Sequence, residues 1–331
     1  MRAYITQLRY VLPEKVEDNP KNRLTRKMGI KSRHIAAEGE TAADLALVAA
    51  EKIFVQSSTV RESVDFLLFC TQSPDYILPT TACILQDTLH LSKHCGALDF
   101  NLGCSGYVYG LGLAKGLIES GQAKHVLLLT AETYSKYINP EDGSVCPVFG
   151  DAATACLIEA IDTEKPGIDA LTYGTDGSGA DKLIVPVGGQ RQPYGAPVVE
   201  TVDDYGSRRT NYNLYMDGGA IMNFALEHVS ETVQQILIKT GLTKDQVDYY
   251  VFHQANHFML DYLQEQCDLQ GLPYWNDVTT YGNTVSNSIP IALSDMLDTK
   301  PPCVSKVMII GFGVGLSWGG CLINLDHINQ N

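Results

Sequence analysis

Three separated fragments of the chain each bring a strand-like run to a side chain that can take part in chemistry. They are Asn101-Leu-Gly-Cys104-Ser-Gly106, Val251-Phe-His253-Gln-Ala-Asn256 and Tyr281-Gly-Asn283-Thr284. Together they supply a thiol nucleophile, an imidazole and an amide donor. Found in this order, they predict acyl-thioester chemistry through a covalent intermediate on the cysteine.

The surroundings of Cys104 favour a nucleophilic thiol. The residue lies at a turn between a predicted strand and a predicted amphipathic helix, where unsatisfied helix N–H groups and the helix dipole should lower the pKa of the thiol. Gly103 and Gly106 let an acyl group approach the backbone closely. The alternative is a buried structural cysteine, which is our interpretation of the other eight cysteines.

His253 and Asn283 indicate a catalytic site only when they are considered together. Alone, a histidine after an apolar strand is more often a core residue, and an asparagine in Gly-Asn-Thr is often only a turn residue. Both follow strand-like runs, at the end of the strands where ligands bind in open α/β sheets. An imidazole Nε2–H and an amide N–H aimed at one carbonyl oxygen would stabilise an enolate, which decarboxylation of a malonyl thioester requires.

Two further motifs have other interpretations. Gly311-Phe-Gly-Val-Gly315 has a superficial likeness to a dinucleotide-binding loop, but it runs into another strand and not into a helix. We expect a tight turn whose Val314 N–H lies opposite the Cys104 N–H, forming an oxyanion hole. In Phe149-Gly-Asp151 we expect the carboxylate of Asp151 to bond turn amides as a structural residue.

A repeated pattern of elements would position these residues. A helical pattern at 41–53 precedes a strand at 64–70, and a second helical pattern at 222–238 precedes a strand at 247–252. Val-Asp occurs at the start of both strands, and Cys70-Thr-Gln72 lines up with His253-Gln254. Further helices are expected at 80–91, 108–119, 257–267 and 288–297, and further strands at 97–101, 123–129 and 305–310.

Strands that alternate with helices predict parallel sheets covered on both faces, and the repeat predicts a duplicated α/β architecture. A pseudo-twofold axis would then bring the reactive strand ends together. We divide the chain into an N-terminal half at 1–165, which carries the cysteine, and a C-terminal half at 166–331. The stretch at about 163–219 is rich in Gly, Asp, Tyr and Pro, and is either an entrance region or a surface excursion.

Composition limits the class of protein. With 331 residues and 45% hydrophobic content, the chain can bury a large core. It shows no signal-peptide h-region and no run of eighteen apolar residues, which predicts a soluble cytoplasmic protein. Nine cysteines without a Cys-x-x-Cys pair indicate neither a disulfide framework nor a zinc site. A net charge of −14 disfavours nucleic acids and anionic membranes as partners.

Over nearly its whole length the chain resembles the ketoacyl-acyl-carrier-protein synthase III family, the initiating β-ketoacyl synthases of the thiolase superfamily. The resemblance is carried by Leu12-Pro-Glu, Gly29-Ile-Lys-Ser-Arg-His-Ile35, the Cys104 turn, Phe149-Gly-Asp151, His253-Gln-Ala-Asn256, Gly282-Asn-Thr284 and Ser317-Trp-Gly319. It implies an α/β thiolase-like fold, a duplicated five-layer αβαβα sandwich with two mixed sheets, in a homodimer.

The resemblance also implies roles and substrates. Cys104 would be the nucleophile, with His253 and Asn283 as the enolate-stabilising pair, while Asn256, Phe312 and Leu78 would contact substrate. Cys104 would be acylated by an acyl-CoA or acyl-carrier donor. A malonyl thioester, for which an acyl carrier protein is one candidate carrier, would then give a 3-oxoacyl thioester for fatty acid biosynthesis. No metal or redox cofactor is required.

Some positions depart from the family. No tryptophan stands at 18–28 and no arginine near 141–143, where members contact the adenine of coenzyme A. His257-Phe258 and Glu265-Gln266 replace basic residues that attract a carrier protein. The pair Arg208-Arg209 is either a replacement phosphate site or an ordinary solvated face. Leu78 stands where many members have a bulkier phenylalanine that lines the acyl pocket of the partner subunit, which leaves room for a donor longer than acetyl.

Three alternatives keep the fold and change the activity. The acyl group could pass to an alcohol, an amine or another non-malonyl acceptor in a specialised pathway. A 3-hydroxy-3-methylglutaryl-type synthase would need an additional catalytic glutamate, for which Glu132 is the candidate. A non-catalytic subunit is disfavoured because the cysteine, histidine and asparagine are all present.

Overall fold

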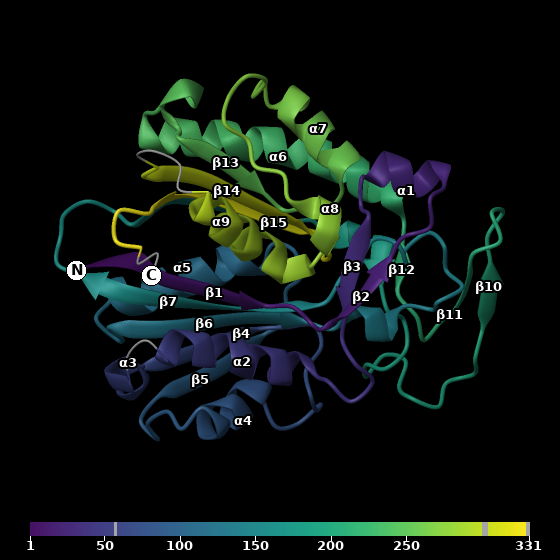
Figure 1. Ribbon diagram of the computed structural model, residues 1–331, viewed down its shortest axis with the longest axis horizontal. Helices are drawn as coiled ribbons and strands as arrows, with labels where there is room; N and C mark the ends of the chain where they lie inside the picture. Colours follow the sequence, from purple (N-terminus) through teal and green to yellow (C-terminus); the bar gives the residue numbers. More distant parts are fainter. Residues whose placement is uncertain (56–57, 300–303, 329–331) are drawn as a thin grey trace.

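Two sheets and three helical layers alternate in the computed structural model (Figure 1). It describes residues 1–55, 58–299 and 304–328. The first sheet has the order β1 (Arg2–Val11), β7 (Ala152–Ile161), β6 (His125–Glu132), β4 (Phe66–Cys70), β5 (Gly96–Phe100). The second sheet has the order β13 (Tyr249–Phe252), β14 (Lys306–Gly313), β15 (Ser317–Asn324), β8 (Ile168–Thr175). The expected five-layer sandwich is confirmed.

Helices fill the space between the sheets and cover both outer faces. The central layer holds α5 (Gly106–Glu119) and α9 (Ser288–Asp298). The first sheet is covered by α2 (Ala42–Phe54), α3 (Ser58–Ser63) and α4 (Thr81–Thr88), and the second by α6 (Gly218–Thr240) and α7 (His257–Gln266). The inner strands are therefore covered on both sides, which explains their continuous apolar runs, such as the wholly buried 126–129 of β6.

The sheets are mixed, which corrects the parallel arrangement inferred from element alternation. β4 runs parallel to β5 and β6, and β13 parallel to β14. β1, β7, β15 and β8 pair antiparallel. These strands are antiparallel because of how they are connected. β14 and β15 form a hairpin without a crossover helix, and β1 pairs with a strand far along the chain. The first sheet uses residues 2–161 and the second 168–324, while the division at 165 itself stays a prediction.

Local signals account for the helix ends. Thr41 and Asp44 form a capping box at the start of α2. The Asp217 carboxylate accepts from the Ala220 N–H, so that α6 begins four residues earlier than expected, at Gly218. Gly241, with φ of 69°, ends the same helix in the left-handed conformation.

Smaller elements surround the carboxyl ends of the central strands. Near the N-terminus lie β2 (Lys15–Asp18), α1 (Arg23–Met28) and β3 (Ser32–Ile35). The expected entrance region holds β9 (Leu183–Ile184), β10 (Glu200–Val202), β11 (Arg208–Thr210) and β12 (Tyr215–Met216), and α8 (Val278–Tyr281) precedes Asn283. Short 3-10 helices span Tyr134–Tyr137, Gly177–Lys182, Lys244–Gln246 and Val285–Asn287.

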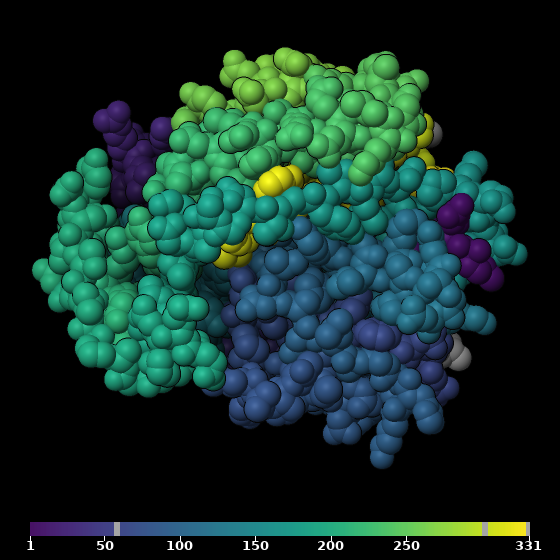
Figure 2. Space-filling model, turned by 180° about the vertical axis from the view of Figure 1, so that it is seen from behind, coloured from purple at the N-terminus to yellow at the C-terminus, as the bar shows by residue number. Residues whose placement is uncertain are grey.

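In the described ranges no helix is long and apolar enough to cross a membrane. The eight cysteines within those ranges are free thiols, and Cys303 lies outside them. Figure 2 shows the teal-green segment around β10 and β11 projecting at one side of the molecule, with a hollow between it and the first half.

Candidate active site

Cys104 lies in a buried turn between β5 and α5, against strand β14. The Gly106 N–H donates to the Gly103 carbonyl at 2.7 Å, which closes the turn, and Cys104 is only 5% exposed. A Cβ on Gly313 would lie 3.0 Å from the Cys104 Sγ, and one on Gly311 would lie 2.5 Å from the Cys104 carbonyl oxygen. The glycines of β14 therefore make room for the reactive turn.

The pKa of Cys104 departs from our expectation. Burial raises the pKa of the thiol above its ordinary value, and the Glu132 carboxylate adds to the rise, whereas the N–H of Cys104 lowers it by less. The predicted fall in pKa is wrong, because a local argument from the helix end left out burial and a charge from another strand. The resting thiol is therefore protonated, and its proton must leave as the thiol attacks.

Glu132 is a fully buried carboxyl at the end of β6. It accepts from the Gln72 N–H at 3.1 Å, and from the hydroxyls of Ser73 and Ser286 at 3.2 Å each. Burial is the largest effect and raises the pKa of Glu132 to about 8. Its oxygens are occupied by protein donors, which favours a supporting role over that of an additional catalytic glutamate.

His253 directly follows β13, and its ring is neutral. The backbone N–H of His253 donates to the Ile310 carbonyl at 2.8 Å, and the ring Nδ1 lies 2.7 Å from the Ser288 Oγ. The same oxygen accepts from the Gln254 N–H at 3.3 Å, so its own hydrogen can go to Nδ1. This arrangement favours the tautomer that carries the ring hydrogen on Nε2. Burial lowers the pKa of His253 to about 3, so the ring is neutral near pH 7.

Asn283 is fixed with its amide hydrogens free. Its N–H donates to the Val148 carbonyl at 2.9 Å, and its carbonyl accepts from the Gly150 N–H at 3.0 Å. The side-chain Oδ1 accepts from the Val285 N–H at 2.9 Å, which leaves Nδ2 as the group that can reach a ligand. Gly282 before it has φ of 66°, and a Cβ there would lie 2.7 Å from the Val148 carbonyl oxygen.

Shared neighbours bring the three predicted residues together. A Cβ on Gly103 would lie 3.3 Å from Cγ1 of Val285, so the Asn283 turn touches the Cys104 turn. His253 is bonded to β14, the strand whose glycines contact Cys104. The Phe312 ring on that strand packs edge-on against the His253 ring, with centroids 5.3 Å apart. The thiol, the imidazole and the amide therefore belong to one neighbourhood between the two sheets.

Val314 follows β14 at the predicted oxyanion position. Its carbonyl accepts from the Ser317 hydroxyl at 2.9 Å, and its side chain faces the space beside Gly103. Within the described residues its N–H has no protein acceptor. Pairing of this N–H with that of Cys104 around an oxyanion stays a prediction, although the position of the turn agrees with it.

Comparisons with known proteins agree with this geometry. The family models for 3-oxoacyl-[acyl-carrier-protein (ACP)] synthase III match residues 98–177 and, for its C-terminal part, 237–325. The chain is 34% identical over 335 residues to the beta-ketoacyl-[acyl-carrier-protein] synthase III of Lactococcus lactis, covering 98% of this chain and 99% of that protein. The protein of the same name from Chlamydia caviae is 33% identical over 314 residues, covering 94% and 90%. The chain belongs to the 3-oxoacyl-[acyl-carrier-protein] synthase III family.

Solved structures of the synthase III family share the fold. A crystal structure of a 3-oxoacyl-(acyl-carrier-protein) synthase III superposes with a TM-score of 0.95 at 45% identity, covering 98% of this chain and all of that one. The synthase from Burkholderia xenovorans LB400 gives a TM-score of 0.89 at 36% identity, covering 99% and 95%.

A cavity of about 1160 Å³ opens beside the Cys104 turn of this synthase III chain. Its polar end includes Gln72, Asn101 and Tyr134 beside Val314, and its walls include Ile77, Leu78, Leu183, Val187 and Leu214. Leu78 is 83% exposed at the rim, whereas Phe312 is 1% exposed beneath His253. Substrate contact by Leu78 and Phe312 stays a prediction, and the cavity agrees with it only for Leu78.

Asn256 and Gln72 complete the surroundings. Asn256 caps α7 through its Oδ1, which accepts from the Met259 N–H at 2.9 Å, so only its amide hydrogens are free for a pantetheine arm. Gln72 donates to Asn101 Oδ1 at 2.8 Å and accepts from the Tyr134 hydroxyl. Gln72 was not among the predicted site residues, although the alignment of Cys70-Thr-Gln72 with His253-Gln254 already placed it near a reactive strand end.

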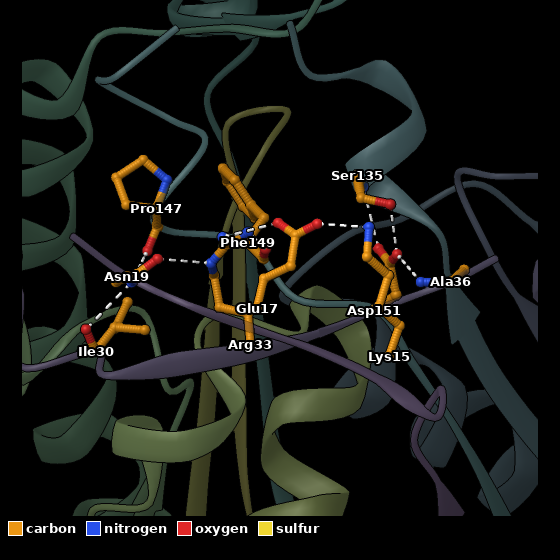
Figure 3. A network of polar contacts seen from close by, with 10 residues as sticks. All are labelled: Lys15, Glu17, Asn19, Ile30, Arg33, Ala36, Ser135, Pro147, Phe149 and Asp151. Atoms are coloured by element: carbon orange, nitrogen blue, oxygen red, sulfur yellow. Dashed lines mark hydrogen bonds and ion pairs between the residues drawn. The ribbon is translucent and has the colours of Figure 1, made fainter. Parts of the chain in front are cut away.

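A polar network supports the Asn283 turn (Figure 3). Arg33 donates to Asn19 Oδ1 at 2.9 Å and to the Phe149 carbonyl at 3.3 Å, and Asn19 donates to the Pro147 carbonyl at 2.8 Å. Asp151 accepts from the backbone N–H groups of Ala36 and Ser135 at 2.8 and 3.0 Å, which confirms the structural interpretation of that carboxylate. The segment that contains α1 is thus tied to Pro147 and Phe149, and Phe149 forms a β-bridge with Asn283.

Proposed function

We propose that Cys104 takes an acyl group from a thioester donor and passes it to the enolate of a malonyl thioester, giving a 3-oxoacyl thioester. The observation that carries this proposal is the orientation of two hydrogen-bond donors near one thiol. Ser288 holds the His253 hydrogen on Nε2, and the Val285 N–H holds the Asn283 oxygen away from the site. Two neutral donors are suited to an enolate oxygen.

In the first half-reaction the Cys104 sulfur attacks the donor carbonyl. The bond between that carbon and the donor sulfur breaks, and the thiol proton of Cys104 ends on the departing donor thiol. The backbone N–H groups of Cys104 and Val314 would hold the tetrahedral oxyanion. Because burial raises the pKa of the thiol, proton loss accompanies attack and does not precede it.

In the second half-reaction the malonyl carboxylate leaves as carbon dioxide. The enolate oxygen of the remaining thioester accepts from the His253 Nε2–H and the Asn283 amide. Its α-carbon then attacks the acyl carbonyl on Cys104, forming the new carbon–carbon bond and releasing the thiolate. The His253 pKa of about 3 suits this step, because a neutral imidazole donates a hydrogen bond to the enolate oxygen without transferring its proton.

Acyl transfer to a non-malonyl acceptor is the second candidate, and family membership makes it the less favoured one. We further propose an active homodimer in the cytoplasm that uses CoA or acyl-carrier thioesters and no bound cofactor. The cavity of about 1160 Å³ with its apolar walls supports a donor longer than acetyl.

The proposal is tested by intact-protein mass spectrometry. Wild-type protein incubated with a panel of acyl-CoA and acyl-carrier donors should gain one acyl mass on the peptide that carries Cys104. The Cys104→Ala variant should gain none, and Cys70→Ala, which removes another buried thiol, should still be labelled. Equal labelling of wild type and Cys104→Ala would refute the nucleophile assignment.

A further inference from the structure

One surface segment of this acidic protein carries concentrated positive charge. The chain has a net charge of −14, yet residues 19–37 contain no acidic residue. Five cations lie within 21–31, and all five are exposed: Lys21, Arg23, Arg26, Lys27 and Lys31. They lie on α1 and on the turns at its two ends, which Figure 1 shows beside α7.

These cations are not neutralised by neighbouring acids. Among the described residues, none of the five forms an ion pair. Arg26 bonds the Asn22 carbonyl at 3.1 Å, and the Lys27 ammonium lies 3.7 Å from the centroid of the Phe258 ring. A field from unpaired exposed cations attracts acidic partners and speeds their association.

The arginine pair in the entrance region, Arg208 and Arg209, is already neutralised by neighbouring carboxylates. Arg208 pairs with Glu141 at 3.7 Å and with Glu200 at 3.2 Å. Arg209 pairs with the buried carboxylate of Asp142 at 3.5 Å, and only 15% of its side chain is exposed. A replacement phosphate site at this pair is therefore disfavoured, because both guanidinium groups are already engaged.

The cationic segment is fixed next to the reactive elements. A Cβ on Gly29 would lie 2.5 Å from the Cβ of His257, which opens α7 just after the His253 fragment. The Lys31 N–H donates to the Thr279 carbonyl at 2.7 Å, four residues before Asn283. Asn19 bonds the Ile30 carbonyl at 3.1 Å, so the network of Figure 3 anchors the segment. A partner bound here would lie close to both enolate-stabilising residues.

Helix α7, which lies beside α1, carries exposed acidic residues. Its exposed Asp261 lies 3.5 Å from His257, and Glu265 lies one turn further on. Asp18, just before the segment, is a further exposed carboxylate. The favourable field is therefore confined to 21–31, where Leu24, 45% exposed, supplies an apolar side chain among the cations.

We propose that the exposed cations of α1 and its flanking turns, and not α7, form the docking surface for an acidic acyl carrier protein. The carrier would bind by charge complementarity and present its thioester arm to the cavity beside Cys104. This inference rests on the proposed function, which supplies the class of partner.

The test is a binding titration that needs no turnover. Holo acyl carrier protein from Lactococcus lactis, without an acyl group, is titrated into the full-length protein at low ionic strength and at several salt concentrations. The double variant Arg23→Glu/Arg26→Glu should raise Kd about tenfold or more and flatten the dependence of Kd on salt. Arg23→Lys/Arg26→Lys keeps the charge and should stay within about threefold of wild type.

The control reverses the same amount of charge elsewhere. Lys93 and Lys124 are exposed and precede β5 and β6, at the sheet end opposite Glu132. Lys93→Glu/Lys124→Glu should change Kd by less than about twofold. Equal effects of the two charge reversals, or no carrier binding by wild type, would overturn the inference.

Kinetic measurements distinguish carrier docking from binding of a CoA phosphate by the same cations. The KM for malonyl-CoA should be the same in wild type and Arg23→Glu/Arg26→Glu. If the variant instead raised KM equally for the CoA thioester and the carrier thioester, the cations would be assigned to a CoA phosphate and the inference would be overturned. Carrier binding without condensation would contradict the proposed function alone. Condensation with an unaltered Kd in Arg23→Glu/Arg26→Glu would contradict the docking surface alone.

Discussion

At the scale of single residues, partners from distant elements set the chemistry of the site. Cys104, His253 and Asn283 could be named from their motifs, because a residue type at a strand end is visible in the chain. Their protonation states and tautomers could not be predicted from the motifs. Burial of Cys104, the carboxyl of Glu132 and the hydroxyl of Ser288 depend on other strands and helices, so the sign of the Cys104 pKa shift was missed and the tautomer of His253 could not be deduced.

Ser288→Ala tests whether the hydroxyl positions the imidazole hydrogen. Without it, Nδ1 loses its donor and the ring can place its hydrogen on either nitrogen. Decarboxylation of a malonyl thioester should slow by about tenfold to a hundredfold, while acylation of Cys104 stays within about threefold. Ser230→Ala, which removes a hydroxyl bonded within α6, should change neither rate. Equal slowing of both half-reactions would show a general loss of structure.

Glu132 predicts a specific effect of pH on stability. Its pKa rises from 4.5 to about 8 on folding, so between these values the folded protein keeps a proton that the unfolded chain releases. This group therefore lowers the free energy of unfolding as pH rises through that window, by on the order of a few kcal/mol, with no further change above it.

Urea unfolding at pH 5 to 8 measures this effect. Glu132→Gln removes the titrating group, so its stability should fall less with rising pH than that of wild type. The exposed Glu164→Gln serves as the control and should follow the wild-type slope. Parallel slopes for wild type and Glu132→Gln would show that Glu132 does not hold its proton in the folded state.

At the scale of elements, periodicity predicted the main helices and strands but not how the strands pair. The strand at 305–310 was expected, yet β14 extends to Gly313 and turns back as β15. Strand direction depends on connections, and periodicity carries no information on it. The Gly311–Gly315 motif was correctly separated from a dinucleotide loop, because a strand and not a helix follows it.

A glycine comparison tests the close approach of β14 to the reactive turn. In Gly311→Ala the new methyl group would meet the Cys104 carbonyl oxygen, which is backbone and cannot swing away. We expect a loss of about 1 to 3 kcal/mol in the free energy of unfolding and slower Cys104 acylation. Gly116→Ala on α5, with nothing within 4 Å, should be neutral or stabilising. Similar unfolding energies for both variants would contradict this packing.

At the scale of the whole molecule, the two sheets bring together motifs up to 179 positions apart, which the internal repeat had indicated. The first sheet ends at β5, an edge strand on which Leu98 is 43% exposed. The nearby Tyr76, Ile77 and Leu78 are exposed too. An unpaired edge beside apolar side chains is typical of an association surface, and we predict that the proposed homodimer has its contact there.

Sedimentation velocity tests that contact. Leu98→Glu would set two like charges near each other across paired edges, so it should shift the protein toward monomer. Val48→Glu, at 48% exposure on the outer helix α2, should leave the dimer intact. A monomeric wild type, or an unaffected Leu98→Glu dimer, would remove β5 as the contact.

In the proposed mechanism, acyl transfer from Cys104 is coupled to malonyl decarboxylation by His253 and Asn283. A single-turnover experiment measures this coupling: the acylated enzyme is isolated, malonyl thioester is added, and carbon dioxide and 3-oxoacyl product are counted. We predict one carbon dioxide and one product for each acyl group, with decarboxylation slowed about a hundredfold or more in His253→Ala and in Asn283→Ala. Loss of the acyl group without carbon dioxide, or unchanged release in both variants, would contradict the claim.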